Sequence, residues 1–538
     1  MMKKILALAV LLGLCPAAMR AQWVSDPSVN TQISDQKGAT AGSIKVAKVG
    51  EDKMYVAWTS FENGGQTRLQ LLDRDGNALW QKGGILVNKN PAASYTTDFS
   101  LLVDPEGCAI VVYSDTRTNL ETKLDFKPFV YKIDQEGNYL WGVDGIAIPC
   151  KSHQGMRPRL CVTNAGSVIV GYSDAINGLF CIQKINEDGA LAWGQNIELG
   201  GIMGNFVATG EDDFILTWFG GGLSAQRFDS YGEEVWYKPV VIEKGDKLNG
   251  HVEPIMVPDG EGGFVVCYGS SVGITEFYVC LQRVNAEGEL MMGLESVTTG
   301  DNKFKHSNGT IGIDVENKEI VCQWTKRAAA VERLMVKKYD YFGDEIWGEE
   351  GIEIDQDLEL GYFAYSVSVL DDQSSIIVYS DYQDNVVNNL IYAKKLDKDG
   401  KVVWSTKLND VVAPKSGAKT ARFNDQLCTF WCDRIGEVFG QNLSFDGKLG
   451  IVTTGIENFE TVTPELYYSN QALIIATGEE NVGGSTLQIS DMAGSVVFQN
   501  WIVPESGQVS IPLTLKRGIY VVSLLQSQRK VIRKILVQ

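Results

Sequence analysis

The sequence predicts an all-β fold: an eight-bladed β-propeller, or alternatively a seven-bladed one, followed by a small C-terminal β-sandwich. Three observations lead to this prediction. A short unit built around a glycine and an aromatic residue recurs eight times. An apolar strand that ends in Tyr or Trp precedes each copy. The repeat then stops near Glu457, where a different all-β pattern begins. Repeats of roughly 40 to 60 residues with about four strands each are typical of propeller blades.

The N-terminus predicts a cleaved signal peptide over residues 1–21. Lys3 and Lys4 precede an apolar stretch, residues 5–14, that is too short to cross a bilayer, and small residues follow it. We expect residues 22–456 to form the propeller and residues 457–538 to form the C-terminal domain. No later segment is long and apolar enough to predict a membrane helix.

Each repeat unit contains an apolar residue, Asp or Asn, two variable residues, Gly, three variable residues and Trp. The Asp or Asn side chain is expected to cap a hairpin turn, and Gly takes the positive φ that other residues resist. The Trp is expected on the strand that leaves the turn, where it wedges neighbouring sheets together. Two copies have Met292 or Ile451 in place of the Trp. The eight glycines are Gly76, Gly137, Gly189, Gly232, Gly288, Gly343, Gly400 and Gly447.

The segment that begins at Trp23 resembles the segment that begins at Trp80 within the first repeat. The eighth unit lacks its own Trp. We therefore expect the N-terminal strand to complete the last blade and close the ring, which would remove the open sheet edges.

The repeat unit is similar to the tryptophan-docking motif of pyrroloquinoline-quinone enzymes and related eight-bladed propellers. It differs by lacking the Thr before Gly and by a shorter spacing from Asp to Gly. The resemblance supports the blade geometry alone. It carries over no quinone site, and no cofactor is expected.

The best candidates for ligand binding follow the second strand of several units. In a propeller, the loop leaving this strand lies on the face that usually binds ligands, near the axis. Carboxylates beside aromatic rings suit sugars, cations or basic peptides. The alternative is that these carboxylates cap their own turns. The candidate residues are Asp115, Asp174, Asp381, Asp433, Tyr113, Tyr172 and Tyr379.

Composition disfavours other classes of function. The net charge of −19 repels phosphate backbones, so we do not expect nucleic-acid binding. The three histidines have no second His at ligand spacing, so no metal site is predicted. Motifs of serine hydrolases, P-loop proteins and zinc proteases are missing, and no catalytic residue is assigned. Most cysteines lie in strand-like segments and are expected to be buried small apolar residues.

The last 80 or so residues resemble the C-terminal sorting domain, type A, of the type IX secretion system of Bacteroidota. The matching features are the turn from Asp491 to Gly494, the strand start from Gly518 to Tyr520, and a basic, apolar chain end that includes Lys534. The resemblance implies the type IX machinery as a partner and an outer-membrane surface or secreted location. The alternative is a small β-sandwich that is appended for binding.

Three functions follow from these features. The first is a non-enzymatic binding propeller whose extracellular ligand is a glycan or a peptide. The second is a hydrolase or lyase acting on carbohydrate, which predicts carboxylates about 5 to 10 Å apart near the ring axis. The third is a structural component of a surface assembly, which predicts an exposed apolar patch.

Overall fold

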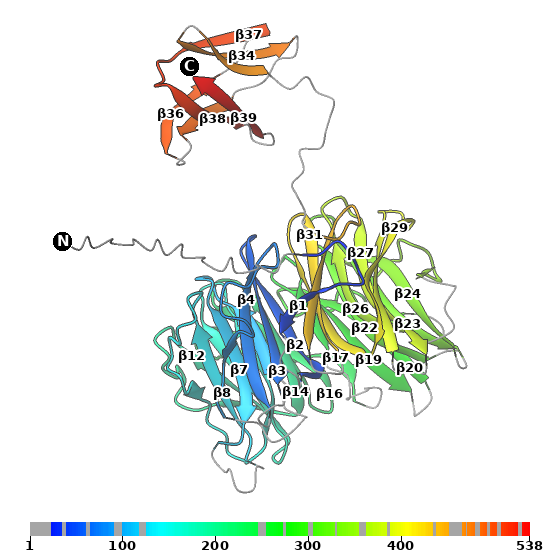
Figure 1. Cartoon of the computed structure of the whole chain (residues 1–538). Coiled ribbons are helices and arrows are strands. Elements are labelled where there is room, and N and C mark those ends of the chain that lie inside the picture. Colours follow the sequence, from blue (N-terminus) through cyan, green and yellow to red (C-terminus); the bar gives the residue numbers. More distant parts are fainter. Residues whose placement is uncertain are drawn as a thin grey trace, which may run out of the picture. The chain divides into compact units, whose positions relative to one another are not determined.

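The computed structural model describes the chain in segments (Figure 1). The predicted signal peptide, residues 1–21, lies outside the described residues. The described residues are 23–34, 39–60, 65–90, 99–117, 125–245, 254–272, 276–299, 305–328, 331–354, 362–384, 388–433, 437–450, 465–469, 471–478, 485–491, 495–502, 507–525 and 530–537.

The chain divides into two compact units, Met1–Ile451 and Val452–Gln538. The regular elements in the described segments are all β-strands, which confirms the all-β prediction. No helix in these segments is long and apolar enough to cross a membrane.

Eight four-stranded antiparallel sheets make up the described part of the first unit. Seven of them use four strands that are consecutive in the sequence. Their first strands are β2 (Ala39–Val49), β6 (Phe99–Val103), β10 (Gly155–Val162), β14 (Ile202–Thr209), β18 (Ile255–Pro258), β22 (Lys305–Asp314) and β26 (Tyr362–Val369). Their second strands are β3 (Lys53–Ser60), β7 (Ala109–Asp115), β11 (Val168–Asp174), β15 (Asp213–Phe219), β19 (Phe264–Val272), β23 (Glu319–Ala328) and β27 (Ser375–Asp384).

The third and fourth strands complete these seven sheets. The third strands are β4 (Gln66–Asp73), β8 (Lys127–Ile133), β12 (Leu179–Ile185), β16 (Gly222–Phe228), β20 (Glu276–Val284), β24 (Val331–Asp340) and β28 (Asn388–Leu396). The fourth strands are β5 (Ile85–Leu86), β9 (Ile146–Ala147), β13 (Ile197–Gly200), β17 (Val240–Lys244), β21 (Val297–Thr298), β25 (Ile352–Glu353) and β29 (Val402–Ala413).

The eighth sheet joins the two ends of the first unit. Its first three strands are β30 (Lys415–Arg422), β31 (Gln426–Asp433) and β32 (Val438–Ser444), and its fourth strand is β1 (Thr31–Ser34) from the N-terminus. This pairing agrees with the sequence prediction that an N-terminal strand completes the last sheet. The Asn30 side-chain amide, next to β1, donates hydrogen bonds to the Leu408 carbonyl at 2.9 Å and to the Gln441 side chain at 3.1 Å.

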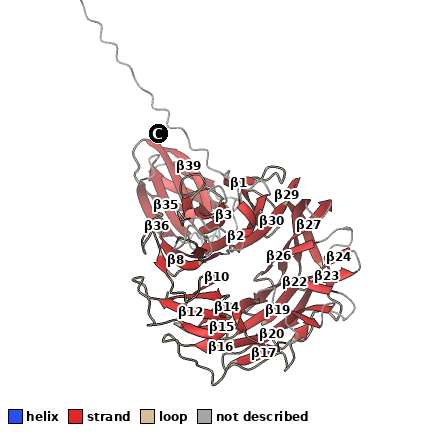
Figure 2. Cartoon of the chain, turned by 90° about the horizontal axis from the view of Figure 1, so that it is seen from below, coloured by secondary structure: helices blue, strands red, loops and turns tan. Residues whose placement is uncertain are grey.

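The first strands bring the eight sheets together in a ring (Figure 2). Each first strand packs against the first strand of the next sheet, and β30 packs against β2. The ring is therefore closed, and the first strands are the ones nearest its axis.

A large side chain, Trp in seven cases out of eight, joins each sheet to the next. The Trp23 indole donates to the Arg74 carbonyl at 2.7 Å, and it lies so close to Gly76 that an added Cβ would be 2.8 Å from the ring. Met292 takes the place of Trp in one pair, a substitution that the sequence left as a degraded copy. The pairs are Trp23–Gly76, Trp80–Gly137, Trp141–Gly189, Trp193–Gly232, Trp236–Gly288, Met292–Gly343, Trp347–Gly400 and Trp404–Gly447. The predicted wedge role is confirmed.

The turns of the repeat have the predicted capping geometry. The Asp73 carboxylate accepts hydrogen bonds from the backbone N–H groups of Asp75 at 3.0 Å and Asn77 at 2.8 Å. Gly76, between them, has a φ of 82°. One detail of the prediction is wrong: Trp80 lies before the short fourth strand β5 rather than on it, because the chain leaves the turn in an irregular segment.

Buried glutamines hold that irregular segment in place, and the sequence analysis did not identify them. The Gln183 side chain accepts from the Trp193 backbone N–H and donates to the Trp193 carbonyl, both at 3.2 Å. Because the amide satisfies both backbone groups of a residue outside the strand ladder, it replaces missing sheet hydrogen bonds. Gln226 does the same for Trp236, while Gln70 and Gln282 each bond the N–H of one residue and the carbonyl of the next.

The second unit contains two antiparallel sheets. One is formed by β33 (Glu465–Ser469), β34 (Ala472–Gly478) and β37 (Gly507–Pro512). The other is formed by β36 (Val496–Ile502), β35 (Ser485–Asp491), β38 (Gly518–Leu525) and β39 (Lys530–Val537). Buried apolar residues from both sheets, including Leu473 of β34 and Leu487 of β35, share one core.

The sorting-motif residues lie at defined places in the second unit. Asp491 ends β35 and accepts a hydrogen bond from the Ser495 N–H at 2.9 Å. Gly518 begins β38, and Tyr520 in the same strand donates to the Lys516 carbonyl at 3.0 Å. Lys534 is exposed on β39. Gly494 lies outside the described residues.

Candidate functional site

The seven residues predicted to bind a ligand lie on four second strands, β7, β11, β27 and β31, toward the end of each strand. Because these strands occupy the same place in their sheets, the residues share one end of the ring. All but one are buried, with at most 1% of their surface exposed, and Asp433 is partly buried.

Asp115 and Tyr113 bond to neighbouring protein groups. The Arg117 guanidinium donates to the Asp115 carboxylate at 2.6 Å, and the Asn88 amide donates to it at 2.8 Å. The Tyr113 hydroxyl donates to the Gly65 carbonyl at 3.0 Å. These contacts hold Arg117, just after β7, against the end of the strand.

Asp174 and Tyr172 make comparable contacts in the next sheet. Burial raises the pKa of the Asp174 carboxyl, but hydrogen bonds from Ser152 and Asn177 outweigh it, so the pKa lies below its ordinary value. The Tyr172 hydroxyl donates to the Pro149 carbonyl at 2.7 Å and accepts from Asn196 at 3.0 Å. Burial raises the pKa of Tyr172, so the phenol stays protonated at neutral pH.

The remaining predicted residues are also part of the protein's own packing. Tyr379 stacks on Tyr392 with ring centroids 5.8 Å apart, and Asp381 follows it in the same buried strand. Asp433 accepts a hydrogen bond from the Glu437 N–H at 2.9 Å and pairs across the sheet with Lys415. Burial lowers the pKa of Lys415 to about 8, with a smaller opposing effect of Asp433.

These contacts agree with the turn-capping alternative for the carboxylates. Ligand binding by the seven residues stays a prediction.

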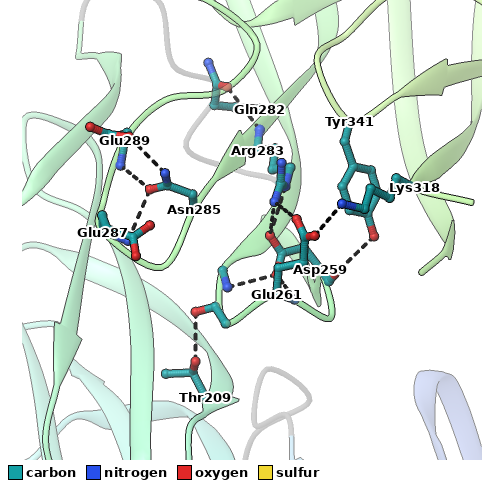
Figure 3. A network of polar contacts seen from close by, with 12 residues as sticks. Thr209, Asp259, Glu261, Gln282, Arg283, Asn285, Glu287, Glu289, Lys318 and Tyr341 are labelled. Atoms are coloured by element: carbon teal, nitrogen blue, oxygen red, sulfur yellow. Dashed lines mark hydrogen bonds and ion pairs between the residues drawn. The ribbon is translucent and has the colours of Figure 1, made fainter. Parts of the chain in front are cut away.

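At the opposite end of the sheets, acidic turn residues pair with cations from the third strands. Figure 3 shows one such network, in which the Arg283 guanidinium lies 2.9 Å from Asp259 and 2.6 Å from Glu261. Arg283 also stacks over the Tyr341 ring, and the Tyr341 hydroxyl donates to the Asp259 carbonyl at 2.8 Å. These carboxylates therefore neutralise buried cations.

One group in the described residues has the composition of a metal site. Ligand atoms of Asp104, Glu106 and Cys108 lie within 4.8 Å of one another. The Lys132 ammonium, at the place that Arg283 has in its own sheet, lies 2.9 Å from both carboxylates. Burial raises the pKa of Cys108 to about 11, so its thiol stays protonated. An ion pair accounts for this group.

The nine described cysteines are free, and eight of them are buried, as expected from their positions in strands. Burial raises the pKa of Cys161 to about 12, for example. A thiol that stays protonated at neutral pH is a poor nucleophile and a poor metal ligand.

A second set of residues emerges from the register of the sheets. Each second strand carries a Tyr or Trp near its end, and the residue just before this aromatic pairs with one residue of the first strand. Lys45 pairs with Ala57 in the first sheet, for example, and Ser100 with Val112 in the second. We call this set the inner belt. It consists of Lys45, Ser100, Arg159, Asn205, Ile255, Thr310, Ser366 and Lys419.

The inner belt is partly exposed although the sheets around it are buried. None of its eight side chains is fully buried. They belong to the first strands, which lie nearest the ring axis. Ile255 is the one apolar member, so the belt forms a polar level in the ring.

In six of the first strands, an irregularity in the pairing with the second strand lies just before the inner-belt residue. In β10 the pairing shifts between Met156 and Arg159, and in β30 it shifts between Ser416 and Lys419. Equivalent shifts occur in β2, β14, β22 and β26. Bulges bend a strand and re-aim the side chains beside them, and they are frequent next to binding sites.

The inner belt supplies hydrogen bonds and positive charge rather than acid–base chemistry. The Asn205 amide donates to the Pro254 carbonyl at 3.0 Å, and the Ser366 hydroxyl donates to Thr420 at 3.1 Å, so sheets are linked at this level. Asp314, at the far end of β22, is the one acidic residue within the bounds of the eight first strands. The paired carboxylates of a glycosidase are therefore not found on these strands.

Sequence reasoning missed the inner belt because its members share no residue type and no motif. The usable signal was weaker. Taken together, the eight first strands contain eight Lys and Arg residues and one acidic residue, Asp314.

Comparison with known protein families gives one match. Residues 469–538 match the secretion system C-terminal sorting domain. This tail sends the chain out through type IX secretion, to the cell surface or beyond, and makes the secretion machinery its partner.

Other comparisons are weaker. No curated protein matches the chain significantly. Among solved structures, a polysaccharide lyase of family PL25, an ulvan lyase, is 11% identical over 80% of this chain and 98% of its own, with a TM-score of 0.40. A protein from Lactobacillus plantarum is 14% identical over 67% and 96%, also with a TM-score of 0.40. An endo-arabinase from Bacteroides thetaiotaomicron is 12% identical over 44% and 92%, with a TM-score of 0.30. These scores are too low to support an argument about this chain.

Proposed function

We propose that residues 22–456 form an exported eight-bladed β-propeller that binds an extracellular glycan or peptide, and that residues 457–538 form a β-sandwich that directs export. The closed ring of eight four-stranded sheets supports the blade count. The shared apolar core of the two C-terminal sheets supports the sandwich.

The observation that carries the binding function is the inner belt. Seven of its eight members are polar, none is fully buried, and they lie at one level of the ring. A few convergent polar groups on a rigid scaffold are what a binding site requires. Asp115 and Asp174, which end their second strands, lie at the same end and would border the ligand.

Five residues of the C-terminal unit carry its proposed role in export. Asp491, Gly494, Gly518, Tyr520 and Lys534 occupy the positions that match the sorting motif, and we propose that the secretion machinery recognises them. The same motif points to a bacterium of the Bacteroidota as the source.

A binding screen tests the proposed function. The chain from Gln22 to Gln538 would be tested against arrays of glycans and peptides, with the same chain unfolded by heat as a control. We expect a set of glycans or peptides that is retained only by the folded chain. Retention of none of them by the folded chain would contradict the binding function.

A further inference from the structure

Three parts of the sorting motif that are far apart in the sequence meet at one end of one sheet. Asp491 ends β35 and pairs with Tyr520 of β38, and Gly518, which begins β38, pairs with Val537 near the chain end in β39. The strands β38 and β39 lie side by side in the second unit (Figure 1). The turn, the strand start and the chain end of the motif are therefore neighbours in space.

The two faces of this sheet have different surroundings. One face carries Ile489, Val522 and Ile535, which are buried in the core shared with the other sheet of the unit. Successive residues of a strand point to opposite faces. The opposite face is exposed at this end, since Ile519 and Leu536 pair directly across β38 and β39 and are 48% and 58% exposed.

A cation lies beside these two apolar side chains on the exposed face. Lys534, which belongs to the sorting motif, is exposed and pairs with Val521, one position along the same face from Ile519 and Leu536. We call Ile519, Lys534 and Leu536 the sorting corner. An antiparallel sheet with one solvated face normally carries polar side chains there. The paired apolar side chains of the corner therefore indicate a surface that another molecule covers.

Charge also distinguishes this part of the chain. Residues 469–538 contain six basic and four acidic residues, whereas the whole chain has a net charge of −19. Lys516 and Arg517, just before β38, are exposed and add two of these cations at the same end of the sheet. Interfaces pair an apolar centre with a rim of complementary charge. The partner that fits the corner has an apolar pocket bordered by carboxylates.

Resting on the proposed export role, we propose that the sorting corner docks onto a protein component of the type IX secretion machinery. The match of residues 469–538 to the sorting domain makes this machinery the partner of the tail. Continuity with the motif supports the position, because Lys534 belongs to both and Ile519 lies between Gly518 and Tyr520. Recognition thus extends beyond the motif to two apolar anchors.

Two other modes of contact fit the corner less well. A strand added to the edge of β39 would bond to its backbone, but charged side chains on an edge strand, here Arg533 and Lys534, disfavour such pairing. Contact with a membrane surface requires a broad apolar face. On this face, polar Ser490 pairs with Val521 directly beside the corner. A protein pocket that accepts two apolar side chains and one cation is the better fit.

The test measures export of the full chain in a bacterium that carries type IX secretion. One double variant removes the apolar anchors, Ile519→Ser and Leu536→Ser. The control double variant, Val402→Ser and Val403→Ser, removes two valines of β29 in the first unit that are exposed to a similar degree, 52% and 56%. Immunoblots compare the amount of chain at the surface and in the medium with the amount inside the cell.

We expect export of the Ile519 and Leu536 double variant to fall by about tenfold or more, since truncation of two anchors at the centre of an interface costs at least that much in affinity. The control variant should be exported like the unaltered chain. The replaced side chains are exposed, so the thermal midpoints of both purified variants should stay close to that of the unaltered chain.

A charge test keeps the inference testable if the double variant is unstable. Lys534→Glu reverses the charge of the corner, and Lys534→Arg keeps it. We expect the Glu variant to lose most of its export and the Arg variant to retain it. A role of Lys534 in the fold alone would lower the thermal midpoint of the Glu variant, so an unchanged midpoint separates recognition from stability.

Three outcomes would overturn the inference. They are normal export of the Ile519 and Leu536 double variant, equal losses in that variant and the control, and normal export of Lys534→Glu. Deletion of residues 457–538 separates this inference from the proposed export role. If the deletion stops export while the corner variants are still exported, the tail directs export and only the docking corner fails.

Discussion

The tryptophans and glycines of the repeat show how single residues define the ring. Each turn glycine has a positive φ, and most of them lie against an indole ring of the preceding sheet. The sequence could predict that the Trp wedges sheets together, because it recurs at one place in each unit, but not that it lies on the turn glycine of the next sheet. The repeat also aligned Met292 with the Trp position, and in the structure Met292 lies against Gly343 as the indoles lie against the other glycines.

A pair of glycine substitutions separates packing from backbone strain. Gly76 and Gly142 have nearly equal φ values, 82° and 83°, but an added Cβ clashes with Trp23 at Gly76 and meets nothing within 4 Å at Gly142. We expect Gly142→Ala to cost about 1–2 kcal/mol for its left-handed backbone. Gly76→Ala should cost about 1–3 kcal/mol more, from overpacking. Urea unfolding followed by fluorescence measures both.

Equal losses in the two glycine variants would show that Trp23 moves aside without cost. That result would contradict the view that the indole is held firmly between Phe430 and the turn.

The candidate site includes residues that a recurring motif predicts and residues that no motif predicts. Asp115 and Asp174 were predicted because a Tyr-Ser-Asp ending recurs, and the structure shows that each carboxylate bonds to neighbouring side chains and backbone groups. The recurrence of the Tyr-Ser-Asp ending therefore agrees with a turn that recurs from sheet to sheet. Lys45, Ser100 and Arg159 differ in type from sheet to sheet, and only the register reveals that they lie at one level.

At the level of strands, the sequence predicted which strands exist better than it predicted where each strand begins and ends. The apolar second strands were found because they are continuous runs that end in an aromatic residue. The fourth strands are short, often two residues, and Trp80 precedes its strand rather than lying on it. Bulges in the first strands have no residue signature, so the level of the inner belt could not be derived from the sequence.

The strand that closes the ring offers a test at this scale. Removal of residues 22–34 deletes β1 and Trp23 and leaves the edge of β32 open. We expect a clear fall in the thermal midpoint and a tendency to aggregate through that edge. Trp23→Ala, which keeps the strand, should cost about 3–5 kcal/mol, the range for a large aromatic residue in a core.

Addition of the missing strand as a synthetic peptide provides the control. A peptide of residues 22–37 should raise the thermal midpoint of the truncated chain, whereas a scrambled peptide of the same composition should not. A truncated chain with an unchanged midpoint would contradict the closing role of β1.

At the scale of the whole molecule, destination and binding belong to different parts of the chain. The sorting domain matches residues 469–538, and the inner belt lies within the first unit. The destination could be predicted from the sequence because the tail carries its motif in order along the chain. The binding surface could not, because it is assembled from eight segments that are far apart in the sequence.

Deletion of residues 457–538 tests the export route. In a bacterium that carries type IX secretion, the full chain should reach the surface or the medium, and the shortened chain should stay inside the cell. Immunoblots of the cell, outer-membrane and medium fractions measure the difference. Transfer of the tail to an unrelated folded protein should export that protein, and failure of that transfer would contradict a self-sufficient signal.

The pairing of β1 with β32 also sets the order in which the molecule can be completed. Asn30 and its partner Gln441 are 411 residues apart along the chain. During synthesis or transport the first segment to appear must wait for almost the whole first unit before its sheet exists. Contacts between such distant segments form slowly, because a long loop has to close first. The last step in building the ring is therefore the return of its earliest segment.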